Sequence, residues 1–374
     1  MNIGRKESQN GKFGNNFKMN KLDLFQGVFK SKKVLLTGHT GFKGSWMAVW
    51  LLELGAEVYG YSLEPYTNRD NFVSTNLEKK INHRLGDVRD SVALANYFQE
   101  VKPDFAFHLA AQPLVIESYS NPHYNFETNL MGTVNFFEAV RNCSSVKVAI
   151  NVTTDKCYKN NEWLWGYREN DPMGGNDPYS ASKGCSELIT HSYIKSFFEK
   201  EGSANVASGR AGNVIGGGDW AENRILPDII RSFIKKEQLE IRNANSVRPW
   251  QFVLEPIFGY LKLAEKLWLE GKSFSGGWNF GPKDLENYSV GDVVDEVKKA
   301  IPTLQVSSPK TPEKLHEAGL LKLDITKAVN LLDWKPKLSF EETIQFTVHG
   351  YLDEINHQDI YASRVAQIEG YCSK

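Results

Sequence analysis

The 374-residue sequence has few cysteines, almost no net charge and no long apolar run. None of its four cysteines belongs to a Cys-x-x-Cys pair, so neither a zinc site nor a disulfide framework is indicated, and we expect no bound metal. Because 44 basic residues offset 45 acidic ones to a formal charge of -1, no global field favours nucleic acid or a membrane surface as a partner. No run of about eighteen apolar residues occurs, so no segment is expected to span a bilayer. These shortages favour a cytoplasmic protein with reduced thiols.

The N-terminus is also poor in apolar side chains. It reads MNIGRKESQNGKFGNNFKMN, which is rich in Gly and Asn and lacks the apolar stretch of a signal peptide. We therefore expect residues 1–30 to form a flexible tail. Met19 is a candidate for the natural first residue, because folded-looking sequence begins just after it.

From residue 33 onward, short continuous apolar runs alternate with helical periods. Phe42, Trp46, Trp50 and Leu54 recur every four residues and predict an amphipathic helix after the first run. Further helices are predicted at 92–98, 125–141 and 179–198. The predicted strands are 33–37, 57–61, 83–85, 104–109, 146–152 and 205–208. Strands without polar alternation, separated by helices, indicate the α/β class, with a Rossmann-type doubly wound parallel sheet.

The sequence changes character after about residue 211, where glycines break the rhythm and Arg, Trp and Asn become frequent. We expect a Rossmann-type first domain over 31–211, to which a helical segment at about 250–272 returns. A smaller α/β domain would comprise 212–249 and 273–350. Residues 351–374 would be a C-terminal extension.

A glycine-rich turn follows the first predicted strand. Gly38, Gly41 and Gly44 form GHTGFKG between that strand and the amphipathic helix. In such a turn one glycine turns the chain tightly, another lets the backbone approach a pyrophosphate, and the last lets helix and sheet pack closely. The pyrophosphate would bind the free amides at the helix N-terminus. The turn therefore predicts a dinucleotide cofactor. In this turn, the other residues expected to contact the cofactor are Thr40, Phe42 and Lys43.

The end of the second predicted strand bears on the choice between NAD and NADP. An acid at that point would bind the adenosine ribose hydroxyls and favour NAD. Glu64 comes late for this role, but Arg69 lies too far along the chain to claim a 2′-phosphate. We therefore expect NAD. Asp87, after the third strand, is a candidate to accept a bond from the adenine amino group or, alternatively, to cap a helix.

A tyrosine and a lysine form the first part of a predicted catalytic set. Tyr179 and Lys183 stand four apart in YSASK and so share one face of a predicted helix. An ammonium beside a phenol lowers the pKa of the phenol, and an oxidised nicotinamide would add positive charge. Such a tyrosine can take a hydroxyl proton while hydride leaves the same carbon. Thr154, at the end of a predicted strand, is placed to share that proton.

Asp155 and Lys156 follow directly in TTDKCY. An acid and a base at adjacent positions beyond a strand end suit an elimination, whereas the alternative is a surface ion pair. The flanking motifs favour the catalytic interpretation. They leave open which of the two residues is the acid and which the base.

Eight motifs, in order over residues 33–282, closely resemble those of CDP-glucose 4,6-dehydratases, which belong to the extended short-chain dehydrogenase/reductase superfamily and its NAD-dependent epimerase/dehydratase family. They are GHTGFKGSW, HLAAQPLV, TTDKCY, WGYREN, DPYSASKG, RAGNVIGGGDW, RPWQFVLEP and WNFGP. Related dTDP-glucose dehydratases carry Asp-Glu where this chain has Asp155-Lys156, which argues against that sister family. Two positions depart from the pattern: Phe252 stands where a histidine is expected, and Gly209 where a valine is usual.

The resemblance implies that bound NAD serves to convert CDP-D-glucose into CDP-4-keto-6-deoxy-D-glucose and water, in deoxysugar and O-antigen biosynthesis. Tyr179, supported by Lys183 and Thr154, would deprotonate the 4-hydroxyl as hydride leaves C4. Lys156 would remove the C5 proton while Asp155 protonates the departing 6-hydroxyl, before hydride returns to C6. The first domain would bind NAD and the second the nucleotide sugar.

The resemblance also enlarges the set of expected contacts. The substrate contacts are Gln112, Asn213, Arg224, Arg248 and Trp250. Asn213 and Arg248 suit the substrate phosphates, the arginine by bidentate bonding, and Arg224 is a weaker candidate. Trp250 would flank a base or sugar, or else belong to the core. Further cofactor contacts are Asp87, Val88, Leu109, Ala110, Ala111, Gln112 and Asn129, together with Tyr179 and Lys183.

Three questions stay open at this level. Another nucleotide-sugar 4,6-dehydratase or a 4-epimerase is the near alternative; an epimerase has no need of the Asp155-Lys156 pair. A non-catalytic NAD-binding regulator is the remote alternative. Apolar stripes on 125–141 and 179–198 would form a four-helix bundle in a homodimer or dimer of dimers, or simply pack on the sheet.

Overall fold

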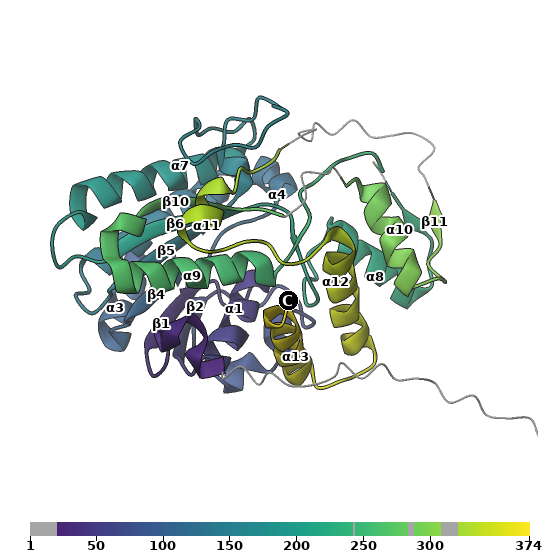
Figure 1. Ribbon diagram of the computed structural model, residues 1–374, viewed down its shortest axis with the longest axis horizontal. Helices are drawn as coiled ribbons and strands as arrows, with labels where there is room; N and C mark the ends of the chain where they lie inside the picture. Colours follow the sequence, from purple (N-terminus) through teal and green to yellow (C-terminus); the bar gives the residue numbers. More distant parts are fainter. Residues whose placement is uncertain (1–20, 242–243, 283–287, 308–320) are drawn as a thin grey trace, which may run out of the picture.

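A computed structural model describes residues 21–241, 244–282, 288–307 and 321–374, and in this part of the chain one seven-stranded parallel sheet forms the centre (Figure 1). The strands are β1 Lys33–Thr37, β2 Glu57–Ser62, β3 Asn82–Leu85, β4 Phe105–His108, β5 Val148–Thr153, β6 Asn205–Ala211 and β10 Gly276–Phe280. Their order across the sheet is β10-β6-β5-β4-β1-β2-β3, so the order reverses between β1 and β4. The predicted Rossmann-type α/β fold is confirmed.

Two helical layers cover the sheet, and successive strand residues face one layer and then the other. Val34 and Leu36 belong to one core cluster, whereas Leu35 between them belongs to the other. The first layer contains η1 Lys21–Gly27, α1 Phe42–Glu53, α9 Leu254–Glu270 and α13 Ile360–Cys372. The second contains α3 Ser91–Val101, α6 Gly132–Arg141, α7 Pro178–Tyr193 and η5 Ile194–Phe198. Burial on both faces explains why these strands read as continuous apolar runs.

Shorter helical elements join these layers to the strands. They are α2 Asn71–Ser74, η2 Leu77–Lys79, α4 Val115–Ser120, α5 Pro122–Phe126, η3 Glu127–Met131, η4 Asp155–Cys157, η6 Gly271–Phe274 and α11 Thr326–Leu331. The helix predicted at 125–141 runs through α5, η3 and α6, and the one at 179–198 through α7 and η5.

The predicted N-terminal tail is wrong for its last ten residues. Phe25, Val28 and Phe29 are buried in the core beneath the sheet. The ring of Phe25 lies 5.4 Å from that of Phe258, and the ring of Phe29 lies 5.0 Å from that of Phe105. These partners are distant in sequence, so no local pattern shows that this short apolar stretch joins the core. The first twenty residues of the predicted tail lie outside the described residues.

A smaller unit lies beside the sheet, on the right of Figure 1. It contains the helices α8 Ile225–Lys235, α10 Val290–Ala300 and α12 Phe340–Ile355. Two short parallel pairs complete it: β7 Val214–Ile215 with β9 Gln251–Phe252, and β8 Leu239–Glu240 with β11 Val306–Ser307. Except for β9, these elements contribute to a separate core cluster, which includes Trp220, Ile229, Val297 and Tyr351.

One strand lies in a different unit from the one that the sequence predicts. Gly276–Phe280 begins the stretch 273–350, which we expect in the smaller domain, yet it pairs with β6 as an edge strand of the main sheet. The predicted C-terminal extension 351–374 contains α13, which packs on α1 in the core. Both corrections have one cause: the elements that β10 and α13 contact, β6 and α1, lie far away in the chain.

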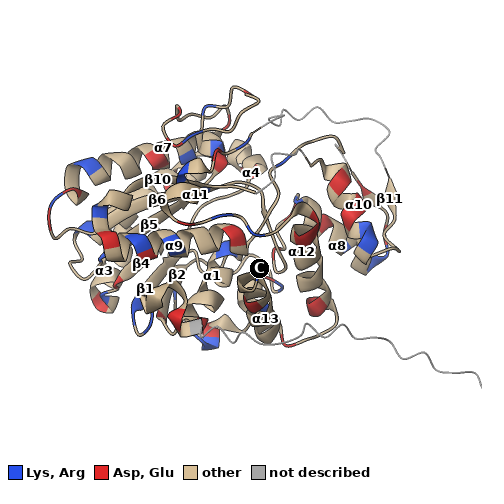
Figure 2. Cartoon of the chain, viewed as in Figure 1, with Lys and Arg blue, Asp and Glu red and all other residues tan. Residues whose placement is uncertain are grey.

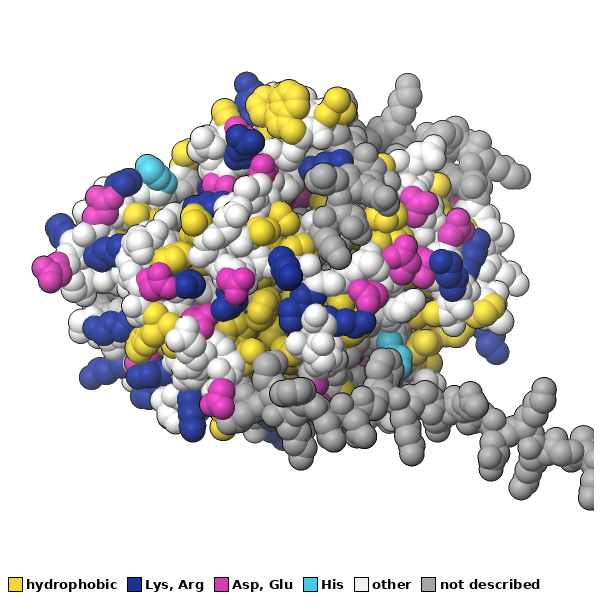
Figure 3. All heavy atoms as spheres, in the orientation of Figure 1, with side chains coloured by type: hydrophobic (Ala, Val, Ile, Leu, Met, Phe, Trp, Pro, Cys, Tyr) yellow, Lys and Arg dark blue, Asp and Glu magenta, His cyan; other side chains and the backbone are white. Residues whose placement is uncertain are grey.

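The surface carries charge of both signs. Lys and Arg alternate with Asp and Glu over the helices in Figure 2, and both kinds are spread over the face drawn in Figure 3. Within the described ranges, no helix is both long enough and apolar enough to cross a bilayer.

Candidate active site

The glycine turn lies where the strand order reverses, between the ends of β1 and β4. Gly38 has a left-handed φ of 74°, and an added Cβ would lie 2.6 Å from the amide nitrogen of Ala110. A Cβ on Gly44 would overlap the carbonyl oxygen of Gly38. Gly41 is the N-cap of α1 and has no side chain to bind the first amides of the helix. These amides form a cradle that fits a pyrophosphate and that larger residues would fill.

Neighbouring side chains fix the turn in place. The hydroxyl of Thr40 donates to the carbonyl of Leu63 over 2.9 Å and lies 2.7 Å from the hydroxyl of Ser62, which ties the turn to the end of β2. Phe42 reaches in the other direction: a Cβ on Gly216 would lie 3.1 Å from its ring. Burial, and then the charges of Lys183 and Arg224, lower the pKa of Lys43 to about 8. The turn therefore places Lys43 in the same electrostatic environment as the predicted catalytic residues.

The other candidates for the adenosine end make internal contacts. Burial opposes ionisation of Asp87, but hydrogen bonds from Arg89 hold the pKa of Asp87 below its ordinary value. The cap of α3 is Asp90, which accepts from the amide of Ala93, so Asp87 is not the helix cap. Val88 is buried, and its carbonyl accepts from the side chain of Asn135.

Residues 109–112 follow β4, which ends at His108, one residue before the predicted end of that strand, and hydrogen bonds tie Gln112 to Asn129. The backbone amide of Gln112 donates to Asn129 over 2.8 Å, and Asn129 donates back to the Gln112 carbonyl over 3.1 Å. Asn129 also donates to Ser182 on α7 over 2.9 Å. Asn129 thus fixes the loop after β4 relative to the helix that carries the tyrosine and lysine.

Tyr179 stands at the start of α7, where Asp177 caps the helix through the amide of Ser180 and Pro178 occupies the first turn. Burial raises the pKa of Tyr179 to about 12, against a hydrogen bond from Thr154 and the charge of Arg224, which lower it. Thr154 therefore lies close enough to affect the ionisation of Tyr179, while its hydroxyl donates to Asp155. In this structure burial outweighs the lowering that we expect for the phenol.

Lys183 is buried one turn further along α7. Burial lowers its pKa to about 8, while the carboxylate of Glu187 raises it. His108, at the end of β4, has its pKa lowered to about 3 by burial and then by the charge of Lys183. Its Nδ1 lies 2.8 Å from the hydroxyl of Thr37. A neutral imidazole and a lysine of reduced pKa therefore lie near each other in the buried part of the candidate site.

The acid of the predicted elimination pair is buried at the end of β5. The hydroxyl of Thr154 donates to the carboxylate of Asp155 over 2.9 Å. A Cβ on residue 212 would overlap that carboxylate, so Gly212 leaves the space that Asp155 occupies. Asp155 also faces Tyr179 and Lys43 electrostatically. Lys156, the next residue of η4, is half-buried.

Sequence reasoning missed the ion pair behind Lys183. Glu187 accepts from Arg210 over 2.7 Å and from Ser208 over 2.7 Å, and it also accepts from Thr153. Arg210 in turn donates to the hydroxyl of Tyr158 over 2.5 Å. Glu187 stands four residues after Lys183 on one helical face, and Arg210 belongs to the RAGN motif, so both signals were present in the sequence.

Among the predicted substrate contacts, Arg224 interacts electrostatically with the predicted catalytic set. Its guanidinium donates to Asp219 over 2.7 Å and interacts with the charges of Tyr179 and Lys43. Asn213 follows Gly212 in a left-handed conformation with φ of 36°. Gln112 is buried, and its amide donates to Glu117 over 2.9 Å.

Arg248 and Trp250 lie in the smaller unit. Arg248 donates to the carbonyl of Val247 over 2.7 Å. Trp250 is buried in the core of that unit, and its indole N–H donates to the carbonyl of Tyr288 over 3.0 Å. Of the two roles expected for Trp250, its contacts in this structure are those of a core residue.

The two departures from the family pattern are packing residues. Phe252 is fully buried and meets the ring of Trp46 edge-on at 5.9 Å. A Cβ on Gly209 would lie 2.6 Å from the ring of Tyr260, so the glycine makes room for that ring on α9.

A parallel sheet of this order, with Tyr179 and Lys183 at the start of the helix after β5, defines a short-chain dehydrogenase/reductase-type enzyme. The family model described as GDP-mannose 4,6 dehydratase matches residues 35–347. A CDP-glucose 4,6-dehydratase from Salmonella typhimurium is 45% identical over 352 residues, which are 93% of this chain and 98% of the relative. The chain belongs to the family of nucleotide-sugar 4,6-dehydratases, which are hydro-lyases.

Solved structures support the same fold. A dTDP-glucose 4,6-dehydratase from Streptomyces venezuelae, solved with NAD, has a TM-score of 0.70 at 21% identity and covers 88% of this chain and 99% of its own. A UDP-glucose 4-epimerase from Thermus thermophilus, in complex with NAD, has a TM-score of 0.70 at 25% identity, with 86% and 99% covered.

Proposed function

We propose that this enzyme converts CDP-D-glucose into CDP-4-keto-6-deoxy-D-glucose and water with NAD as its bound cofactor. The observation that carries the proposal is the position of Asp155, buried, bonded to Thr154 and within electrostatic range of Tyr179. An oxidation alone needs only Thr154, Tyr179 and Lys183; a carboxyl group beside them suits the loss of a hydroxyl. The substrate base rests on the 45% identical relative from Salmonella typhimurium, whose name includes CDP-glucose.

The residues present fit NAD. Gly38, Gly41 and Gly44 leave the cradle for its pyrophosphate open at the N-terminus of α1. Arg69, the arginine nearest the end of β2 in sequence, lies with its guanidinium 3.6 Å from the ring centre of Trp220, a contact that occupies it away from a 2′-phosphate. NAD, when bound, supplies an acceptor that takes hydride from C4 and gives it back to C6.

Tyr179 would take the proton of the 4-hydroxyl. The hydroxyl of Thr154 and the positive charge of Arg224 both lower the pKa of the phenol against burial. Lys183 would serve the same end when a substrate and a cofactor complete the site, because an ammonium favours the phenolate. The neutral imidazole of His108 beneath Lys183 adds no competing charge.

Asp155 and Lys156 would then carry the elimination across C5 and C6. A ketone at C4 makes the C5 hydrogen acidic, so a base can remove it and an acid can protonate the leaving 6-hydroxyl. We assign the acid to Asp155, which is buried, and the base to the half-buried Lys156. Gly212 keeps the space for the carboxylate.

The nucleotide diphosphate would be bound from the smaller unit. Arg224, fixed by Asp219, is our first candidate for the phosphates, because it lies between that unit and Tyr179. Arg248 and Asn213 remain proposed contacts, and Gln112 and Trp250 complete the proposed set. Guanidinium groups suit phosphate because they bind two oxygens at once.

We further propose that the enzyme works in the cytoplasm on deoxysugar precursors, including those of O-antigen, and as a homodimer or a dimer of dimers. Met131 on η3 and Leu188 on α7 are exposed on the two helices that the dimer would pair, whereas Phe136 and Ile194 on the same helices pack on the sheet. Light scattering of the purified protein, with Leu188→Asp as the disrupting variant, tests the assembly.

The activity is tested by offering CDP-, dTDP- and UDP-glucose and GDP-mannose in turn, with mass spectrometry of the products. We expect loss of one water from CDP-glucose. Loss of water from another sugar nucleotide would overturn the base assignment, and an epimer of unchanged mass would favour a 4-epimerase. Asp155→Asn should slow dehydration about 100-fold or more. Asp171→Asn, in an exposed turn against the amide of Arg168, is the matched control and should be neutral.

A further inference from the structure

The segment 216–220, GGGDW, connects the main sheet to the smaller unit and is held along its whole length. The carbonyl of Gly217 accepts from Trp46 of α1 over 3.0 Å, that of Gly218 from the amide of Asn71 over 3.1 Å, and that of Asp219 from Tyr351 of α12 over 2.6 Å. Each donor comes from a different helix. Such a segment has little freedom to move relative to any of the three.

Glycines bring the segment this close. A Cβ on Gly217 would lie 2.7 Å from the backbone of Gly350 and 3.0 Å from the guanidinium of Arg364. Gly218 has a left-handed φ of 83°, and its Cβ would lie 2.5 Å from the side chain of Asn71. Larger residues at these two positions would push the segment away from α12 and α2.

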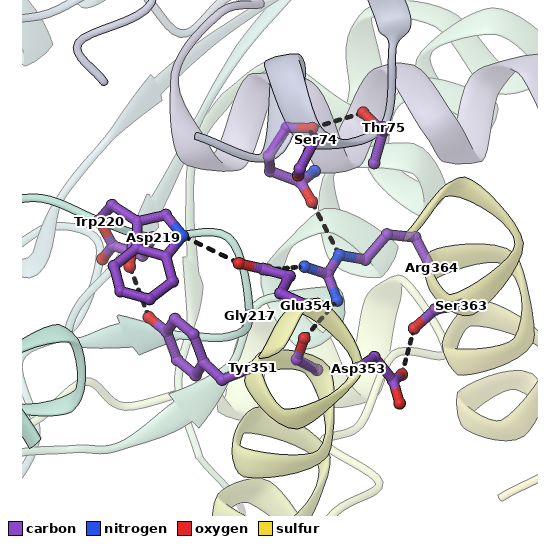
Figure 4. A network of polar contacts seen from close by, with 12 residues as sticks. Ser74, Thr75, Gly217, Asp219, Trp220, Tyr351, Asp353, Glu354, Ser363 and Arg364 are labelled. Atoms are coloured by element: carbon purple, nitrogen blue, oxygen red, sulfur yellow. Dashed lines mark hydrogen bonds and ion pairs between the residues drawn. The ribbon is translucent and has the colours of Figure 1, made fainter. Parts of the chain in front are cut away.

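Arg364 on α13 joins the two helices on either side of the segment (Figure 4). It is fully buried, donates through Nε to Asn71 over 2.7 Å and through Nη1 to the carbonyl of Gly350 over 3.1 Å, and pairs through Nη2 with Glu354. Glu354 also accepts from the indole of Trp220 over 3.0 Å. A buried guanidinium is costly unless every nitrogen is engaged, so the arrangement indicates a specific role.

The segment ends at the substrate side of the site. Asp219 accepts a hydrogen bond from Arg224 over 2.7 Å. The charge of Arg224 also interacts with Tyr179 and Lys43. We infer that Arg364 is a positioning residue of the last helix, which fastens the segment 216–220 so that Asp219 holds Arg224 ready for the diphosphate of the substrate. This inference rests on the proposed function, because it assigns Arg224 to that diphosphate.

Arg364→Met tests the inference because methionine fills similar space without the three donors. We expect the KM for CDP-glucose, and the Kd for CDP measured by calorimetry, to rise about tenfold, since a misplaced arginine loses a charged hydrogen bond. The kcat should stay within about twofold, because the catalytic residues lie on other elements. Arg364→Lys keeps the positive charge that pairs with Glu354 but loses the planar guanidinium, so its KM and Kd should lie between those of the wild type and of Arg364→Met.

Tyr371→Phe is the matched control on the same helix. Tyr371 donates to Glu255 of α9 over 2.6 Å, and its ring packs on those of Trp50 and Phe258. We expect a lower Tm with an unchanged KM. A KM that rises equally in Tyr371→Phe, or that stays at the wild-type value in a folded Arg364→Met, would overturn the inference. If Arg364→Met does not fold, Glu354→Gln makes the same test and should raise KM a few fold, about threefold.

The outcome can be separated from that of the proposed function. If the wild-type protein does not dehydrate CDP-glucose, the activity is wrong, but the weakened binding of CDP, UDP, dTDP and GDP to Arg364→Met still tests the positioning. Adding Arg364→Met to Arg224→Gln should cost little more than Arg224→Gln alone, because both changes act on one contact. Full additivity in this cycle, or no diphosphate binding by the wild type, would contradict the role of Arg364.

Discussion

Two buried glutamate–arginine pairs belong to different parts of the molecule, and their electrostatics differ. Glu187 and Arg210 lie behind Lys183, whereas Glu354 and Arg364 lie behind Arg224. Burial opposes the charge of Glu187, but Arg210, Thr153 and Ser208 together hold its pKa below the ordinary value. Burial raises the pKa of Glu354 in spite of Arg364 and Trp220. The pKa of Arg210 is raised and that of Arg364 is lowered, so the charged form is favoured in the first pair and disfavoured in the second for the arginines as well.

The difference has a structural origin. Glu187 is on α7 and Arg210 on β6, next to each other in the main sheet layers, where hydroxyls from β5 and β6 add donors to the carboxylate. Glu354 and Arg364 are on the last two helices and must join a glycine segment to α2. The surroundings of the first pair thus favour its charged forms, although Nε of Arg210 has no hydrogen-bond partner among the described residues, whereas burial disfavours the charges of the second pair. We expect the first to govern stability and the second to govern substrate affinity.

The largest effect is expected from Glu187→Gln. A depressed carboxylate pKa contributes stability above the unfolded value near pH 4.5, so the contribution is fully present at pH 7. Its loss leaves Arg210 buried without its counter-ion and should cost about 3–5 kcal/mol in the free energy of unfolding. Urea denaturation at pH 7 measures it. Ser208→Ala, which removes one neutral donor to the same carboxylate, is the control and should cost about 1 kcal/mol.

A smaller effect is expected from Glu354→Gln. A raised carboxylate pKa means that the folded protein disfavours the charge, so stability from this group declines as pH rises from 4.5 through the folded pKa. At pH 7 a neutral amide therefore replaces a charge that burial already opposes, and the cost should be about 2 kcal/mol. If Glu354→Gln were as costly as Glu187→Gln in the same urea assay, the two pairs would be equivalent and the comparison would fail.

The smallest effect is expected from Thr154→Val, which should change only the oxidation step that we assign to Tyr179. Thr154→Val removes the hydrogen bond that lowers the pKa of Tyr179, so the phenol ionises at higher pH. At neutral pH we expect kcat to fall about tenfold, one pKa unit of ionised tyrosine, with KM unchanged. The rising limb of kcat against pH should move to higher pH. A rise in KM with an unmoved limb would show that Thr154 binds substrate and does not tune the tyrosine.

The sequence predicts the first side of the site better than the second, for a physical reason. Strands buried on both faces are continuous apolar runs, and the helix turn from Tyr179 to Lys183 is local, so both are visible in the pattern. β10 was assigned to the wrong unit because GGWNF has no apolar run, and only its pairing with β6 defines it. The contact of Arg364 with Asn71 joins residues 293 positions apart, which no local pattern encodes.

The same reason explains the N-terminal error. Phe25 and Phe29 belong to a short apolar stretch, LDLFQGVF, and their partners belong to α9 and β4, far away in the chain. The tight turn after β1 is visible in the sequence because the conformation of Gly38 and the close contact of Gly44 are local demands of the backbone.

The most direct test of the central claim follows one hydrogen. CDP-glucose carrying deuterium at C4 is converted by the wild-type enzyme, and the product is analysed by NMR and mass spectrometry. If Tyr179 and bound NAD oxidise C4 and Asp155 and Lys156 then carry the elimination, the deuterium appears at C6 and a solvent hydrogen at C5. Loss of the label to solvent, or its retention at C4 in an epimer, would contradict the account.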